Sequence, residues 1–338
     1  MFKKAAVFTD IHFGLKGNSK VHNQDCEDFI DWYIEQAQAA GCETGIFCGD
    51  WHHNRNSLNL TTMDATIRSM EKLGAAFEQF FFFDGNHDLY YKDKRDVNST
   101  AFAKHIPGIT FVDEITTIED VTIVPWLVGD EWKKLRKLQS KYVFGHFELP
   151  YFKMNAMVDM PDVGTIQSDH FAGCGKVFSG HFHKRQYMKN ITYMGNAFPH
   201  NYADAWDDDR GMMILEYGGE PKYINWPDMP RYITIKISEL LADPDKYLKP
   251  KMYVRVTLDI KISYEEANFI RETFIDKYSL RELQLIPEQV DNAQQPTVQV
   301  QKFDSVDQIV IKQLQGVDSE TFDKNILTAI YNDLDVAN

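Results

Sequence analysis

Seven of the eleven histidines lie in short polar stretches that each follow an apolar run. The stretches are TDIH, GDWHH, DGNHD, GHFE and SGHFH, and the apolar runs before them have the length of buried strands. Chance placement of histidines would rarely give this clustering. The predicted strand ends therefore carry a set of candidate ligands and catalytic groups: Asp10, His12, Asp50, His52, His53, Asn86, His87, His146, His181 and His183.

The donor types of these residues indicate a transition-metal site. Carboxylate, amide and imidazole donors without thiolate suit Mn²⁺, Fe²⁺ or Zn²⁺ better than the all-oxygen cages of Mg²⁺ or Ca²⁺. The donors are too many for one ion. Two ions about 3.5–4 Å apart could share one carboxylate, clamp a phosphate, supply a hydroxide and stabilise the leaving oxygen. We predict that Asp50, which follows the central strand, is the shared carboxylate.

The elements that must position these residues alternate between strands and helices. Strand-like runs at KAAVF, TGIFC and QFFFF are separated by helical patterns at residues 25–40 and 61–79, which is the rhythm of βαβ units. The run Phe80–Phe83 indicates a strand buried on both faces. In open α/β sheets, sites form beyond the carboxyl ends of the strands. Further runs at TIVPW, KYVFGHF, KVFSGHF and ITYMGN predict a second, mixed sheet, and so a two-sheet α/β sandwich.

The character of the chain changes near Pro230. RYITIKI and MYVRVTLDI show strand alternation, Ser263 and Glu266 form a capping box before a helix, and RELQLIP is typical of a closing strand. A polar stretch with prolines and two amphipathic helices follow. We therefore expect an α/β core at 1–229, a small α+β capping module at 230–287, a linker at 288–302 and a helical tail at 303–338.

Composition limits the function classes. The formal net charge of −14 argues against an autonomous nucleic-acid coat protein, because such proteins rely on basic surface, but it leaves room for metal ions or a local basic patch. No apolar run is long enough for a signal peptide or a membrane span, so we expect a soluble protein. The four cysteines show no CxxC spacing and are expected to be reduced core thiols in a cytoplasmic compartment.

The motif order DIH, GDWHH, GNHD, GHFE and SGHFH resembles the calcineurin-like metallophosphoesterase superfamily. The likeness is greatest to its SbcD-like branch, the nuclease subunit of double-strand-break repair and phage recombination complexes, and it spans roughly residues 5–230. It implies two divalent ions, Mn²⁺ above all. By this resemblance, Asp10, His12, Asp50 and His183 hold one ion, and Asp50, Asn86, His146 and His181 hold the other.

The resemblance also assigns catalytic roles. His87 matches the superfamily's catalytic histidine, whose protonated imidazole could stabilise the pentacovalent phosphate or protonate the leaving 3′ oxygen. His53 matches a histidine that helps to orient the DNA phosphate for exonuclease cutting. His52 is an extra histidine, so the assignment to His53 could shift by one position. Asp88 is expected to orient His87 or to cap the following turn.

Partners follow from the same resemblance. The SbcD-like branch processes DNA, at double-stranded ends or as single strands, together with an SMC-like coiled-coil ATPase. This chain has no GxxxxGK[ST] motif, so ATP hydrolysis would have to come from another subunit. The tail at 303–338 is expected to dock on the coiled coil. A homodimer and a cytoplasmic location, in the host if the source is a phage, are further expectations, and no membrane partner is expected.

Two other functions stay open at this point. A phosphodiesterase of nucleotides or other small phosphodiesters would carry the same metal motifs but would need neither the module nor the tail. A non-catalytic scaffold that recruits the ATPase is disfavoured by the complete ligand set. A protein phosphatase is also disfavoured, because GDWHHN lacks the arginine of GDxVDRG and GNHD stands in place of GNHE.

Several basic residues and histidines receive simpler interpretations. The basic run at 133–141 is expected to be a solvated helix face, whereas Lys92, Lys94 and Arg95 are better placed to contact DNA because they follow His87 closely. The remaining histidines are expected to be structural: His22, His105, His170 and His200.

Overall fold

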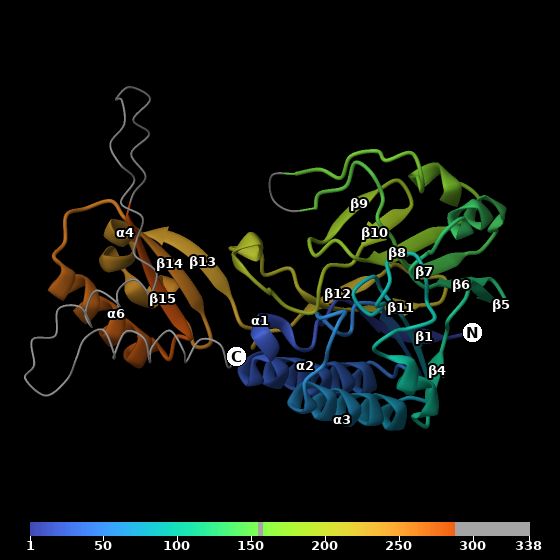
Figure 1. Cartoon of the computed structure of the whole chain (residues 1–338), viewed down its shortest axis with the longest axis horizontal. Helices are drawn as coiled ribbons and strands as arrows, with labels where there is room; N and C mark the ends of the chain where they lie inside the picture. Colours follow the sequence, from blue (N-terminus) through green and yellow to red (C-terminus); the bar gives the residue numbers. More distant parts are fainter. Residues whose placement is uncertain (155–157, 288–338) are drawn as a thin grey trace, which may run out of the picture. The chain divides into compact units, whose positions relative to one another are not determined.

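Two six-stranded sheets pack face to face in the computed structural model, which describes residues 1–154 and 158–287 (Figure 1). The strand order is β12-β11-β1-β2-β3-β4 in the first sheet and β5-β6-β7-β8-β10-β9 in the second. Side chains of both sheets, among them Val7, Phe81, Phe144 and Phe178, form a shared core. Each sheet contains parallel and antiparallel pairs, and the predicted two-sheet α/β sandwich is confirmed.

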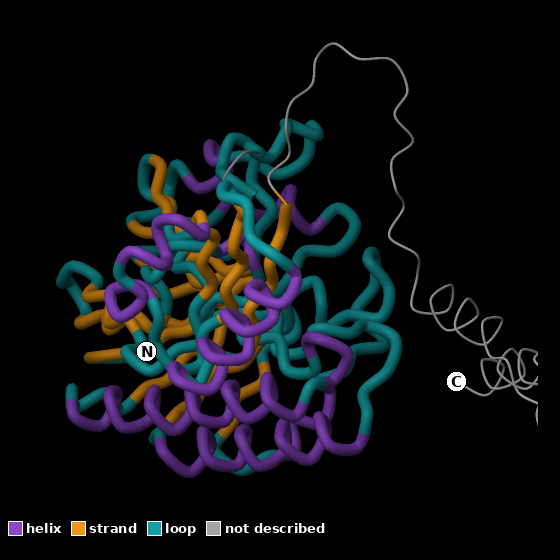
Figure 2. Tube along the Cα trace, turned by 90° about the vertical axis from the view of Figure 1, so that its left-hand side faces the viewer, coloured by secondary structure: helices purple, strands orange, loops and turns teal. Residues whose placement is uncertain are grey.

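The first sheet is covered on its outer face by two long helices that lie side by side (Figure 2). Its parallel strands are β1 (Lys4–Phe8), β2 (Thr44–Cys48), β3 (Gln79–Phe83) and β4 (Ile109–Phe111). Its antiparallel strands are β11 (Gly211–Glu216) and β12 (Lys222–Asn225). The covering helices are α2 (Lys20–Ala39) and α3 (Leu60–Ala76), and the short α1 (Leu15–Asn18) precedes them.

The four phenylalanines of β3 fill the core on both sides of the first sheet. Successive side chains of a strand point to opposite faces. Phe80 and Phe82 join the core beneath α2 and α3, while Phe81 and Phe83 join the core between the sheets. An uninterrupted apolar run is required here, because this strand has no solvent-facing side.

The second sheet carries the other half of the candidate site. Its strands are β5 (Thr116–Ile118), β6 (Val121–Val124), β7 (Tyr142–His146), β8 (Lys176–Gly180), β9 (Gln186–Met188) and β10 (Ile191–Tyr193). Its outer face is covered by loops and short 3₁₀ helices, including Glu131–Lys137 and Ser168–Phe171. Of the basic run at 133–141, expected to be a solvated helix face, residues 133–137 belong to this 3₁₀ helix and 138–141 follow it.

A small module at residues 232–287 consists of three parallel strands joined by helical crossovers. Its elements are β13 (Tyr232–Lys236), α4 (Ile237–Ala242), α5 (Pro244–Tyr247), β14 (Tyr253–Leu258), α6 (Tyr264–Tyr278) and β15 (Glu282–Pro287). The predicted capping box is confirmed: the Ser263 side chain accepts from the Glu266 N–H, and the Glu266 side chain accepts from the Ser263 N–H. The module has an apolar core of its own.

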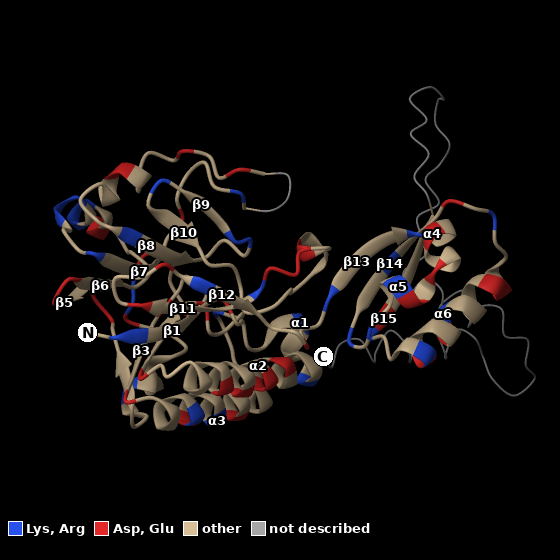
Figure 3. Ribbon diagram, turned by 180° about the vertical axis from the view of Figure 1, so that it is seen from behind, with Lys and Arg blue, Asp and Glu red and all other residues tan. Residues whose placement is uncertain are grey.

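The distribution of acidic side chains and the burial of the cysteines match the expectations from composition. Acidic side chains gather along α2 (Figure 3), where Glu27 and Asp31 pair with Arg68 and Lys72 of α3. All four cysteines are buried free thiols, as predicted. Among the described residues, no helix is long and apolar enough to cross a membrane. The predicted linker and tail, at 288–302 and 303–338, lie outside the described residues.

Candidate metal centre

The loops that follow β1, β2, β3, β7 and β8 meet at one place and are held together by hydrogen bonds. The Asp10 N–H donates to the Gly49 carbonyl at 3.0 Å, and the His12 N–H donates to the Asp50 carbonyl at 3.2 Å. Between the two sheets, the His181 N–H donates to the Asp10 carboxylate at 3.1 Å. The sandwich therefore brings candidate residues from both sheets into one cluster.

Four of the candidate residues have left-handed backbone conformations. The φ angles are 52° at Asp10, 54° at His12, 62° at Asp50 and 92° at His181. Such angles are uncommon for residues with a side chain, and they persist only where the surrounding structure holds them. Their concentration in this cluster indicates that the fold tolerates backbone strain in order to point these side chains toward the centre.

Glycines before the ligand positions allow the loops to approach closely. A Cβ on Gly85 would lie 2.2 Å from Oδ1 of Asp50, and a Cβ on Gly180 would lie 2.1 Å from Oγ1 of Thr9. Neither distance is possible without moving the loops. The glycines in the GNHD and SGHFH motifs are thus required by packing at the centre.

Asp10, His12, Asp50 and His183 form the first donor group. Nε2 of His12 lies 3.3 Å from Nε2 of His183, 3.7 Å from Oδ2 of Asp50 and 3.9 Å from Oδ1 of Asp10. Nε2 of His183 is also 3.8 Å from Oδ1 of Asp10. Asp10, His12 and Asp50 each offer one ligand atom within 4.8 Å of the other two, and His183 joins this set through its contacts with His12 and Asp10.

Asp50, Asn86, His146 and His181 form the second donor group. Nε2 of His146 lies 3.4 Å from Oδ2 of Asp50 and 3.1 Å from Oδ1 of Asn86, and Nδ1 of His181 lies 2.8 Å from Oδ1 of Asn86. Nδ1 of His146 donates to the Cys48 carbonyl at 2.8 Å, which leaves Nε2 as the free donor atom. Oδ2 of Asp50 contacts both groups, the position expected of a shared carboxylate.

These two groups fit two divalent ions. Donor atoms that bind the same ion at about 2.0–2.2 Å lie about 3–4 Å apart, as they do here. Both groups combine carboxylate oxygen with imidazole nitrogen, and neither contains a thiolate. The electrostatics agree: although burial opposes it, the imidazoles of His146, His87 and His12 hold the pKa of Asp50 well below its usual range.

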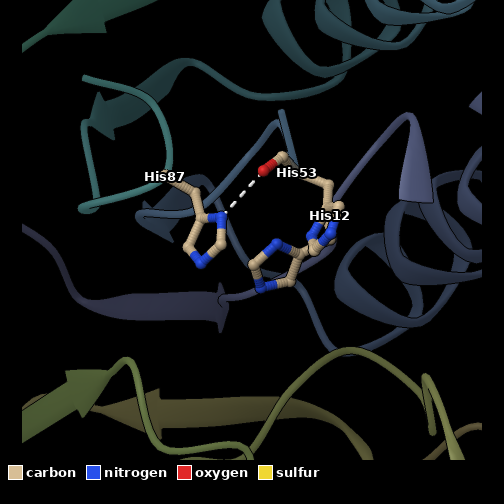
Figure 4. A group of neighbouring side chains, drawn as sticks. All are labelled: His12, His53 and His87. Atoms are coloured by element: carbon tan, nitrogen blue, oxygen red, sulfur yellow. Dashed lines mark hydrogen bonds between the residues drawn. The ribbon is translucent and has the colours of Figure 1, made fainter. Parts of the chain in front are cut away.

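His87 and His53 lie beside His12 of the first donor group (Figure 4). Nδ1 of His87 donates to the carbonyl of His53 at 2.8 Å, and the His87 N–H donates to Oδ1 of Asp50 at 2.8 Å. The His53 and His87 rings are stacked, with centroids 5.3 Å apart, and the His12 ring lies 4.9 Å from that of His87. Burial lowers the pKa of His53 to about 4.

His52 points away from the centre. Its ring is fully buried, with Nδ1 2.8 Å from Oγ of Ser99 and Nε2 3.0 Å from Oγ1 of Thr66. Burial lowers the pKa of His52 to about 3, so the ring is neutral. Of the two adjacent histidines, it is therefore His53 that the structure places at the centre.

Asp88 ties two loops together. Its carboxylate accepts from the backbone N–H groups of Asp50, Trp51, His52 and Gly85 at 2.9–3.2 Å. These bonds hold the backbone around the shared carboxylate, rather than orienting the His87 ring or capping the following turn as the sequence predicts.

Sequence reasoning missed three residues that contact this cluster. His200 was expected to be structural, yet its ring lies 5.2 Å from that of His12 and 5.3 Å from that of His183. Nε2 of His22 donates to the His12 carbonyl at 3.0 Å. Oε1 of Glu148 lies 3.4 Å from Nε2 of His181. Glu148 could have been found as the carboxylate of GHFE, whereas His22 and His200 carry no local motif.

The basic residues near the centre divide into two kinds. Arg95 pairs with Glu131 and donates to the Trp126 carbonyl, so its guanidinium is committed to holding a loop. Lys92 and Lys94 are exposed. Arg95 is therefore a poor candidate for contact with DNA, whereas Lys92 and Lys94 stay predicted DNA contacts.

Two cavities adjoin the donor groups. One, of about 180 Å³, is lined by Trp126, Trp132 and Glu148 together with His146 of the second group. The other, of about 290 Å³, is lined by Lys184 and Asn201 together with His183 of the first group. Each donor group thus has open space beside it.

Comparison with known proteins gives one relative of nearly full length. No known family profile matches the chain. The sequence is 23% identical over 311 residues to exonuclease subunit 1 of Enterobacteria phage T4, which covers 84% of this chain and 91% of that protein. The chain resembles the calcineurin-like nucleases in sequence. This finding agrees with the motif order and with the predicted enzyme class, a metal-dependent phosphodiesterase.

Two solved structures show weaker likeness. A nuclease named MPE from Pseudomonas putida has 18% identity and a TM-score of 0.29, covering 53% of this chain and 61% of its own. This chain thus spans less than two thirds of that nuclease. A dimetal phosphatase from Danio rerio has 11% identity and a TM-score of 0.38, covering 62% of this chain and 91% of its own. Both scores are below 0.5, so no conclusion rests on them.

Proposed function

We propose that this chain is a two-metal DNA nuclease, with exonuclease and endonuclease activity, that acts with an SMC-like ATPase in double-strand-break processing and recombination. The observation that carries the proposal is the position of Asp50. One carboxylate oxygen contacts both donor groups, and the other accepts from the backbone of His87. The similarity to a phage exonuclease subunit supports DNA as the substrate.

In this proposal, each donor group holds one ion, Mn²⁺ in the first instance. Two bound ions would polarise the phosphate and lower the pKa of water at the centre. The first ion is assigned to Asp10, His12, Asp50 and His183, and the second to Asp50, Asn86, His146 and His181. The hydrogen bond from Nδ1 of His146 to the Cys48 carbonyl fixes the tautomer that ligation requires.

His87 is the proposed general acid. Its Nδ1 proton is held by the His53 carbonyl, so Nε2 is the nitrogen that can face the substrate. A protonated Nε2 would donate to the leaving 3′ oxygen or stabilise the charge on the phosphate. His53 stacks on His87 and is proposed to orient the DNA phosphate.

The cavities and charges around the centre suit a phosphodiester that continues into a nucleotide on either side of the reacting phosphate. A cavity beside His146 contains two tryptophans, Trp126 and Trp132, whose flat surfaces suit stacking with a base. A cavity beside His183 contains Lys184, which can meet a neighbouring phosphate. Exposed Lys92 and Lys94 are further candidate phosphate contacts.

The proposal also includes partners. The sequence relative is a subunit of an exonuclease, which supports an assembly with another chain. We propose that the tail at 303–338 binds the ATPase and that the module at 230–287 caps the site and binds DNA. We also propose that the protein is a homodimer. It would work in the cytoplasm, or in the host cytoplasm if the source is a phage.

The test is degradation of end-labelled linear duplex DNA by the purified chain with Mn²⁺, Mg²⁺ or EDTA. Wild-type protein should release nucleotides with Mn²⁺, and His87→Ala should lower kcat by about 10²–10⁴-fold while retaining both ions. Asp50→Ala should lose activity together with metal. Cleavage that persists in both variants would show a contaminating nuclease and remove the support for this function.

A phosphodiesterase of nucleotides is the second candidate. The 180 Å³ cavity beside His146 favours it, because a space of this size holds about one aromatic ring. Under this alternative, wild-type protein hydrolyses bis-p-nitrophenyl phosphate and nucleotide diesters but leaves duplex and single-stranded DNA intact, with or without the ATPase.

A further inference from the structure

His200 is a buried imidazole without a role in the proposed reaction. It lies in the loop after β10 and is 2% exposed. Neither of its ring nitrogens has a hydrogen-bond partner within residues 1–154 and 158–287. Because burying an unpaired polar group costs free energy, a position that served packing alone would favour an apolar ring.

The surroundings of His200 join the apolar core to the first donor group. Its ring packs against Phe198, with centroids 5.1 Å apart, and against His22 at 5.6 Å. The rings of His12 and His183 lie at 5.2 Å and 5.3 Å. His200 is thus next to two of the residues assigned to the first ion.

The backbone of His200 is held in place. Its N–H donates to Oδ2 of Asp204 at 2.9 Å, and the other oxygen of Asp204 accepts from Arg210, whose side chain is buried. The side chain of Asn201 accepts from the Ala203 N–H and begins a short 3₁₀ helix. A side chain on such a support loses little freedom when it binds a ligand.

His200 and two of the assigned ligands form a group of imidazoles that could hold one ion. One nitrogen each of His12, His183 and His200 lies within 4.8 Å of the other two. We propose that His200 is a fifth protein ligand of the first ion, beside Asp10, His12, Asp50 and His183. This inference rests on the proposed two-metal function, and it gives a partner to a ring nitrogen that otherwise has none.

A fifth ligand would make the two ions unequal. The first ion would have three imidazoles and two carboxylates, whereas the second would have two imidazoles, one carboxylate and one amide. Imidazole nitrogen favours Zn²⁺, Fe²⁺ or Co²⁺ over Mg²⁺. We therefore expect the first site to bind its ion tightly and to prefer Zn²⁺, Fe²⁺ or Co²⁺ over Mg²⁺. The ion in the second site should exchange more readily.

The test measures metal binding by the full chain without DNA. Calorimetric titration with Zn²⁺ and absorption spectra of the Co²⁺-loaded protein are compared for wild type, His200→Ala and His200→Phe. His200→Phe keeps a ring for packing, so it stays informative if His200→Ala does not fold. We expect one of two affinities to fall about 10–100-fold in each variant, with a changed Co²⁺ spectrum.

His170→Phe is the matched control. His170 is also buried and has one ring nitrogen without a partner in the described part of the chain, but it lies in the 3₁₀ helix Ser168–Phe171. Its substitution should leave both affinities unchanged. Unchanged affinities and spectra in both His200 variants would overturn the five-ligand proposal and leave the two-metal function standing. Wild-type protein that binds fewer than two ions would overturn both.

Discussion

His52 and His53 are adjacent in the sequence but have different surroundings. His53 stacks on His87, whereas His52 is hydrogen-bonded to Ser99 and Thr66 in the core. Both follow the same strand, so only the tertiary structure could separate them. The sequence predicted a histidine at this place in the centre, and the packing decided which one.

Replacing His52 should therefore affect stability more than chemistry. We expect His52→Ala to lower the free energy of unfolding by about 1–3 kcal/mol, because it removes a fully buried imidazole and its hydrogen bonds to Ser99 and Thr66. Urea unfolding measures this loss, and the folded variant should still bind two ions. His105→Ala, at an exposed position, is the control and should unfold like wild type. Loss of an ion in folded His52→Ala would contradict this interpretation.

The affinity of the second donor group for its ion should depend on pH because of His146. Burial lowers the pKa of His146, but the adjacent Asp50 carboxylate raises it more, to about 9. A ligating imidazole must be unprotonated, so below about pH 9 the second ion displaces one proton. Its affinity should rise about tenfold per pH unit between about pH 6 and 8.

Calorimetry in buffers of different protonation enthalpy measures the protons released. Burial lowers the pKa of His12 and of His181, so these rings are already neutral and should release none. One proton for the second ion is the expected result. A count of zero would mean that His146 is neutral before the ion binds.

At the level of elements, the strands and the order of their ligands were predictable, and so was the start of α3, but the start of α2 was not. The run Phe80–Phe83 has only one structure that buries every side chain, a strand covered on both faces. Helix α2 begins at Lys20 rather than near Asp25, because the Ser19 side chain accepts from the His22 N–H. His200 was missed because long-range packing, and no local motif, brings it to the centre.

The loop after β3 should not tolerate a side chain at Gly85. In Gly85→Ala, the new Cβ would lie 2.2 Å from Oδ1 of Asp50 and 2.4 Å from its backbone nitrogen. Asp50 would have to move away from both donor groups. We expect at least a tenfold loss of turnover and weaker binding of both ions. Gly219→Ala is the control for the loss of a glycine, because its new Cβ would lie 3.3 Å from the nearest atom.

At the level of the whole molecule, the tail is expected to bind a partner and not to contribute to chemistry. Every residue assigned to the centre, including His200, lies between residues 10 and 200. Removing residues 288–338 should therefore abolish co-purification of the ATPase while hydrolysis of bis-p-nitrophenyl phosphate stays within about twofold of wild type. Pull-down and a chromogenic assay on the same preparation measure both. Retained ATPase binding would place the docking surface elsewhere.

The carboxylate of Asp88 has a consequence for motion. By accepting four backbone N–H groups from the loops after β2 and β3, it joins these loops into one rigid body. Asp50 and His87 must then move together or not at all.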